Sequence, residues 1–144
     1  MRLKKGQASN NFWFGEFKVS VDYPELASRI QIIEYQEKII SFLCDGILQP
    51  IRNYFGKTEV LSAVRSEELN KAVGGSNTSD HLYIPENKIW SCATDFSCEK
   101  SHPEKVFRWI IEQRLPFRQL IYYLDKILYT LQLIFLENRL SVKF

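Results

Sequence analysis

The sequence predicts an α+β fold in which helices pack on one small antiparallel sheet within a single domain. The chain has 144 residues, 45% of them hydrophobic and 25% charged, a size and composition typical of one globular domain. Helix-spaced and strand-like segments follow one another as helix, strand, helix, strands, helix and an ambiguous tail, which differs from the strict alternation of a parallel α/β fold. We therefore expect one domain over residues 1–144, with residues 1–10 flexible and a divergent tail at 123–144.

Composition and charge exclude several classes of function. Lys and Arg exceed Asp and Glu by 19 to 17, a net charge of +2, which is too small to indicate nucleic acid or an anionic membrane as the partner. The most apolar stretch, 119–136, holds Asp125 and Lys126 near its middle, where a charge costs about 2.5–3.5 kcal/mol on insertion, so we expect no membrane span. No apolar segment follows the basic residues after Met1, so we expect no signal peptide and a cytoplasmic protein on synthesis.

The first third of the chain is predicted to be largely helical. The aromatic cluster at 11–17 is too short for a helix and is expected to cover the core. Asp22 is expected to cap a helix whose apolar residues follow steps of 3, 4 and 7. Those apolar residues are Leu26, Ile30, Ile33, Ile40, Leu43 and Ile47. Pro50 lacks an amide and is expected to interrupt this helix, with a short second helix at 50–54 that ends at Gly56.

The middle of the chain is predicted to hold a strand, a short helix and a hairpin. Residues 58–64 are rich in β-branched side chains and predict the strand. Residues 66–73 predict the helix, with Ser66 as its cap and two glycines at its end. Residues 82–90 predict a hairpin or an excursion that leads into a strand at 93–96.

Two further helices are predicted toward the C-terminus. Ser101 and Glu104 are spaced as a capping box, which predicts a helix that runs toward Gln113. In the tail, apolar residues recur at steps of 3 and 4 from Leu124 to Phe135, a spacing typical of an amphipathic helix.

Three residues with the chemistry of a metal or substrate site lie between positions 62 and 95. Arg65 follows the predicted strand, while His81 and Asp95 lie in one loop and strand region. A neutral imidazole and a carboxylate are suitable zinc ligands, and a guanidinium can hold a substrate carboxylate through two parallel hydrogen bonds. Taken singly, each residue also has a structural interpretation, as a loop histidine, a strand-end turn residue and a solvated charge.

Taken in order, the residues of this region closely resemble the zinc D-alanyl-D-alanine carboxypeptidase family, which includes peptidoglycan peptidases of phage lysins and shares the Hedgehog/DD-peptidase fold. The pattern of that family is roughly S-G-Y-R-S, three variable residues and an asparagine, then V-G-G, S-x-H and A-x-D. Ala63 and Val64 replace its glycine and tyrosine. The resemblance covers residues from about 11 to 122 and is closest to small phage-type members. The matching residues are Ser62, Arg65, Ser66, Asn70, Val73, Gly74, Gly75, Ser79, His81, Ala93 and Asp95.

The resemblance implies a zinc metallopeptidase that cleaves peptidoglycan stem peptides. It places one zinc ion on His81, Asp95 and a third protein ligand, and leaves the fourth position to the attacking water. It puts Arg65 and Ser79 on the substrate side, Arg65 to bind or polarise substrate oxygens and Ser79 to orient the site by hydrogen bonding. His81 and Asp95 are farther apart in sequence than is usual in the family, and the predicted turn at 85–88 absorbs the difference as an insertion.

The chain departs from the family pattern near its C-terminus. After the matching residues 119–122, Tyr123 stands where the family has its general-base glutamate, and about Tyr129 stands where it has its third zinc ligand, a histidine. A tyrosine, with an ordinary pKa of about 10, is no base near neutrality and is an uncommon zinc ligand. No histidine follows His102, which lies in the predicted capping box.

Two functions therefore remain open. The first is a zinc carboxypeptidase or endopeptidase of the cell wall. Asp125 or Glu137 could supply the carboxylate that is missing at Tyr123, but the spacing of neither residue selects it. The second is a catalytically inactive relic of the same fold that binds cell-wall peptides or serves as a virion-associated structural protein, its tail replaced by divergence or by a frame shift. Either protein is expected to reach the periplasm or cell wall at lysis or with a phage particle. The oligomeric state is left open.

Overall fold

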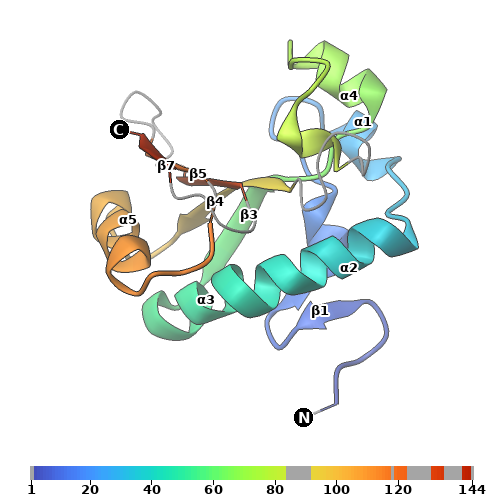
Figure 1. Ribbon diagram of the computed structural model, residues 1–144. Helices are drawn as coiled ribbons and strands as arrows, with labels where there is room; N and C mark the ends of the chain where they lie inside the picture. Colours follow the sequence, from blue (N-terminus) through green and yellow to red (C-terminus); the bar gives the residue numbers. More distant parts are fainter. Residues whose placement is uncertain (1, 84–91, 118, 123–130, 135–140, 144) are drawn as a thin grey trace.

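The computed structural model describes residues 2–83, 92–117, 119–122, 131–134 and 141–143, and a five-stranded sheet organises them (Figure 1). The strands lie in the order β3-β4-β6-β5-β7. Neighbouring strands are antiparallel except β5 and β7, which run parallel at one edge. The strands are β3 (Thr58–Ser62), β4 (Ala93–Cys98), β5 (Gln119–Tyr122), β6 (Leu131–Ile134) and β7 (Ser141–Lys143). Because helices pack against this sheet, the predicted α+β class is confirmed.

One long helical segment supplies much of the core. It consists of α2 (Glu34–Leu43), the π-helical segment η2 (Cys44–Leu48) and α3 (Gln49–Phe55), which follow one another without a break (Figure 1). A further helix, α5 (Pro103–Glu112), contacts β4, β5 and α3. Removal of their apolar side chains from water is the main force that holds these helices to the sheet. The fully buried ones are Ile39, Ile40, Leu43, Cys44, Ile47, Leu48, Ile51, Val106 and Ile110.

The N-terminal aromatic cluster enters the core instead of covering it. Its elements are β1 (Gln7–Ser9), β2 (Phe12–Trp13) and the 3-10 helix η1 (Phe14–Phe17). Phe12 and Phe17 are fully buried, whereas Trp13 is 42% exposed. The expectation of a surface cover is therefore wrong for two of these rings. Strand alternation sends Phe12 inward and Trp13 outward, which the composition of the cluster does not reveal.

The helix expected after Asp22 is interrupted. The first helix, α1 (Pro24–Ser28), ends early, and the chain leaves the helical path before α2 begins. The residue that precedes α1 is Tyr23 and not Asp22, and no side chain caps this helix end. Ile33 lies in an extended conformation and is 57% exposed, off the predicted apolar stripe. The run at 30–33 contains three isoleucines, whose β-branched side chains lose rotamer freedom in a helix and so weaken it there.

Pro50 does not interrupt the helix as expected. It lies in the first turn of α3, directly after η2, in which the amide of Gln49 donates to the carbonyl of Cys44 five residues back. The five-residue spacing of this hydrogen bond lies just before Pro50, which has no amide hydrogen to donate. The helix therefore continues past the proline. The end of α3 is as predicted, since Gly56 adopts a φ of 86° and its amide donates to Arg52 O at 2.9 Å.

The elements around the predicted site agree with expectation. The strand expected at 58–64 is β3, and the short helix is α4 (Glu67–Ala72). Ser66 caps α4 as predicted, because its Oγ accepts the amide of Leu69 at 3.1 Å. Gly74 follows α4 with a φ of 75°, the left-handed conformation expected after a helix.

The cap of α5 differs from the predicted one. His102, and not Ser101, is the residue that precedes this helix, and its Nδ1 accepts the amide of Glu104 at 3.2 Å. Pro103 then occupies the first helical position, where its missing amide costs nothing. The proline fixes the helix start one residue later than the Ser101 capping box implied.

The tail is partly strand, not the predicted amphipathic helix. Residues Leu131–Ile134 form β6, which pairs with β4 on one side and β5 on the other, so the helix expected at 124–135 is wrong there. Pairing along both edges satisfies the backbone of β6 and overrides its helical spacing. Residues 123–130 lie outside the described part of the chain. Residues 84–90 of the hairpin expected at 82–90 also lie outside it. No described helix is long and apolar enough to cross a membrane.

Candidate metal centre

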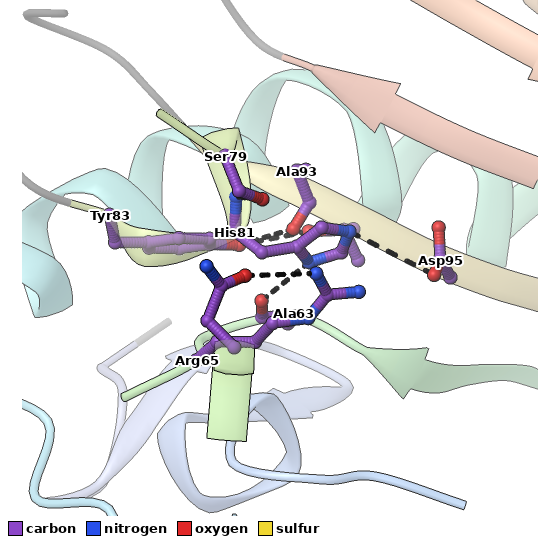
Figure 2. Close-up of polar contacts among 9 residues, drawn as sticks. Ala63, Arg65, Ser79, His81, Tyr83, Ala93 and Asp95 are labelled. Atoms are coloured by element: carbon purple, nitrogen blue, oxygen red, sulfur yellow. Dashed lines mark hydrogen bonds and ion pairs between the residues drawn. The ribbon is translucent and has the colours of Figure 1, made fainter. Parts of the chain in front are cut away.

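The predicted site residues meet where β3, β4 and a short 3-10 helix, η3 (Asp80–Leu82), come together (Figure 2). His81 lies within η3. Asp95 lies on β4, opposite Ser62 of β3 and beside a β-bulge in that pair. Ser79 precedes η3, and its Oγ accepts the amide of His81 at 3.2 Å. Segments that are far apart in the sequence thus bring His81 and Asp95 together.

A backbone carbonyl fixes the orientation of the His81 ring. Nδ1 of the ring lies 2.7 Å from the carbonyl oxygen of Ala63. Because a carbonyl oxygen only accepts, Nδ1 carries the proton in this hydrogen bond. The other ring nitrogen, Nε2, faces Asp95 Oδ2 at 3.9 Å (Figure 2). In the neutral ring, Nε2 therefore holds the lone pair that binds a metal ion.

Both members of the pair are buried. His81 is 3% exposed and Asp95 is 8% exposed. A distance of 3.9 Å between Nε2 and Oδ2 is too long for a hydrogen bond. Two ligand atoms of a tetrahedral zinc ion lie about 3.4 Å apart, so a small closing movement would bring both atoms into ligand positions. One imidazole nitrogen and one carboxylate oxygen fit zinc as two of its three protein ligands.

Arg65 is held beside the pair by a set of hydrogen bonds that we call the Asn70 brace. The amide of Arg65 donates to the carbonyl of His81 at 2.7 Å, and its Nη1 donates to Asn70 Oδ1 at 3.3 Å. Asn70 is 3% exposed, and its Nδ2 donates to Ser76 O at 2.9 Å. Gly75 leaves the room for this amide, because a Cβ there would overlap Asn70 Oδ1 and lie 3.1 Å from Arg65 Nη1. The brace therefore depends on a glycine at this position.

Tyr83 ties the end of η3 to the strand that carries Asp95. Its side chain is 1% exposed, and its phenol donates to Ala93 O at 3.1 Å. The same oxygen lies 3.0 Å from Thr94 Oγ1, so the threonine hydroxyl donates in this second hydrogen bond. Burial raises the pKa of the Tyr83 phenol well above its ordinary value, and the group stays neutral near pH 7.

Among the residues that the structure describes, no third ligand joins the pair: no group of three His, Cys, Asp or Glu side chains there is placed to hold a metal ion. His102 instead caps α5, and its ring lies edge-on to Tyr122 with the centroids 6.5 Å apart. Burial raises the pKa of the Cys44 and Cys98 thiols above its ordinary value. Four residues considered from the sequence lie outside the described part of the chain: Tyr123, Asp125, Tyr129 and Glu137.

The sequence pattern identifies the two candidate ligands but not the groups that position them. Ala63 is a departure from the family pattern, yet its backbone carbonyl orients His81, and a backbone acceptor leaves no trace in residue type. Asn70 and Gly75 match the pattern without revealing that the glycine makes room for the amide. The sequence signal for the brace is the asparagine at the family's position, and the structure adds that this asparagine is buried.

Comparison with known protein families agrees with the resemblance that the motifs predict. A family model described as Peptidase M15 matches residues 21–128, three quarters of the chain. The matched range includes Arg65, Ser79, His81 and Asp95. Neither the curated proteins nor the solved structures include a match. The chain belongs to the peptidase M15 family.

Proposed function

We propose that the protein is a zinc-dependent metallopeptidase that acts on the stem peptides of peptidoglycan, with His81 and Asp95 as metal ligands. The observation that carries this proposal is the buried pair itself, in which the Ala63 carbonyl holds the proton on Nδ1 and turns Nε2 toward the carboxylate at 3.9 Å. The orientation of a metal-binding histidine by a hydrogen bond to its other nitrogen is a recurring feature of such sites. Membership of the peptidase M15 family supports the same chemistry.

The other residues of the site have roles that follow from their contacts. Ser79 caps η3 and so holds His81 in place through the backbone. Arg65 keeps a fixed position through Asn70, and its guanidinium offers a planar set of donors that suits the carboxylate or carbonyl oxygens of a peptide. Bound zinc would polarise the scissile carbonyl and activate water for attack on the amide.

A second function competes with catalysis, namely binding of cell-wall peptides, or a structural role in a virion, by an inactive member of the family. The observation that favours it is the absence of a third His, Cys, Asp or Glu beside the pair among the described residues. Tyr123, which stands where the family pattern has its general-base glutamate, also favours this second function, because loss of a general base lowers the rate roughly 10²–10⁴-fold. Small phage-type origin and release to the periplasm at lysis stay predictions for either function.

Metal analysis combined with a cleavage assay separates the two functions. The wild-type protein, His81→Ala and His102→Ala would each be purified after growth in zinc-replete medium and incubated with a synthetic stem pentapeptide. The peptidase predicts about one zinc per chain in wild type and His102→Ala, none in His81→Ala, and cleavage that chelation abolishes. Binding of the pentapeptide without cleavage would establish the second function, and wild-type protein without zinc would refute the first.

A further inference from the structure

Tyr83 connects the two segments that carry His81 and Asp95. It follows His81 by two residues, at the end of η3. Its phenol forms hydrogen bonds with Ala93 and Thr94, the two residues of β4 that directly precede Asp95 (Figure 2). The register between β3 and β4 ends at Asp95. The phenol thus binds β4 just where the pairing of this strand with β3 stops.

The backbone of Tyr83 adopts a conformation that its own side chain disfavours. Its φ of 52° and ψ of 42° are left-handed, which is uncommon for a residue with a bulky side chain. Such a conformation persists only where the surrounding contacts hold it. Here the contacts are the burial of the ring, which is 1% exposed, and the two hydrogen bonds of the phenol, at 3.1 and 3.0 Å. Loss of the hydroxyl would therefore let the end of η3 relax away from β4.

The distance between η3 and β4 matters because each segment carries one candidate ligand. His81 Nε2 and Asp95 Oδ2 lie 3.9 Å apart, whereas two ligand atoms of a tetrahedral zinc ion lie about 3.4 Å apart. Ligand constellations must be held to within about 0.5 Å of the productive geometry to work well. The pair is near this limit, so any further separation of the two segments weakens the site.

We infer that Tyr83 is a positioning residue of the metal centre, whose phenol sets the separation of His81 and Asp95 and thereby the affinity of the site for zinc. The inference rests on the proposed function. It adds to that function a residue that lies between the S-x-H and A-x-D motifs and belongs to neither of them.

The test compares zinc binding by three variants that each lose one buried hydroxyl. Tyr83→Phe removes the phenol oxygen and keeps the ring. Thr94→Val removes one of its two partners and leaves the hydrogen bond to Ala93. Thr58→Val is the matched control, because Thr58 is a buried residue at the other end of the β3 and β4 pair, opposite Cys98. Circular dichroism would verify that each protein is folded at the temperature of the binding measurement.

Zinc affinity would be measured by calorimetry, and the geometry of the site by the visible absorption of the Co²⁺ form. We expect Tyr83→Phe to bind zinc about 10-fold more weakly than wild type, the lower end of the effect of groups that bond directly to a ligand. Thr94→Val should lose less, and Thr58→Val should bind as wild type does. The Co²⁺ bands should shift in Tyr83→Phe and not in Thr58→Val, because they report the arrangement of the ligands and not the stability of the fold.

Two sets of results would overturn the inference. Wild-type affinity and an unshifted spectrum in Tyr83→Phe, or an equal loss of affinity in Thr58→Val, would refute the role of Tyr83. The proposed function would stand in that case, provided that wild-type binding is lost in His81→Ala. Zinc binding that is absent from wild type, or that is the same in wild type and His81→Ala, would overturn both the inference and the proposed function.

Discussion

The Asn70 brace provides the sharpest prediction on stability, which concerns Gly75→Ala. A Cβ on residue 75 would overlap Asn70 Oδ1 and lie 2.8 Å from Asn70 Cγ. Asn70 is 3% exposed, and its side-chain amide forms hydrogen bonds with Arg65 and Ser76. The substitution therefore forces the amide to move and breaks both hydrogen bonds, although alanine is otherwise a small and well tolerated residue.

The magnitude follows from these two hydrogen bonds. Each contributes about 0.5–1.5 kcal/mol net, and a buried polar group left without a partner costs about 1–3 kcal/mol. We expect Gly75→Ala to lower the free energy of unfolding by about 2–4 kcal/mol, a large part of the total stability of a typical domain. Gly15→Ala is the control, because a Cβ at residue 15 meets nothing within 4 Å, and its effect should stay within about 0.5 kcal/mol.

A double-mutant cycle in urea tests the cause as well as the size of the effect. In the Asn70→Ala background the obstructing amide is gone and only the flexible end of Arg65 remains near the new Cβ, so Gly75→Ala should then cost much less. Unfolding would be followed by tryptophan fluorescence and by circular dichroism for all four proteins of the cycle. Equal costs of Gly75→Ala in both backgrounds would refute the proposed contact between these residues.

Other buried and capping groups give three more expectations. Burial raises the pKa of Tyr83 in the folded state above its unfolded value of about 10, so the stability that the neutral phenol contributes is complete below about pH 10 and is lost as the pH rises through the folded value. The free energy of unfolding should fall more steeply above pH 10 in wild type than in Tyr83→Phe, and equal slopes would contradict this. Iodoacetamide should label half-buried Cys98 before Cys44, as mass spectrometry of a digest would show; earlier labelling of Cys44 would be evidence against this packing. His102→Ala should lose about 1 kcal/mol with its cap hydrogen bond and keep the zinc content of wild type, whereas lost zinc would place His102 in the site.

The sequence predicts the features that depend on local chemistry. Ser66 caps α4, and Gly56 ends α3, because a hydroxyl acceptor and a positive φ are properties of single residues. The candidate metal ligands are predictable for a similar reason. His81 and Asp95 match the family motifs in residue type and in their order along the chain. The structure then adds their distance and their burial.

The features that the sequence does not predict depend on partners elsewhere in the chain. The spacing of apolar residues is the same whether a helix is continuous or interrupted. It therefore predicts that Ile33 is buried, whereas Ile33 is exposed in the structure. The residues Leu131–Ile134 have helical spacing but find two strands to pair with, and pairing decides their structure. The orientation of His81 depends on a main-chain oxygen, which no residue type announces.

The most direct test of the metal centre is an anomalous difference map from a crystal grown with zinc and measured at the zinc absorption edge. The proposed site predicts one peak between His81 Nε2 and the Asp95 carboxylate, about 2.0–2.2 Å from each ligand atom. No peak between these two side chains at saturating zinc, or a peak only elsewhere on the protein, would contradict the central claim that they form a zinc site.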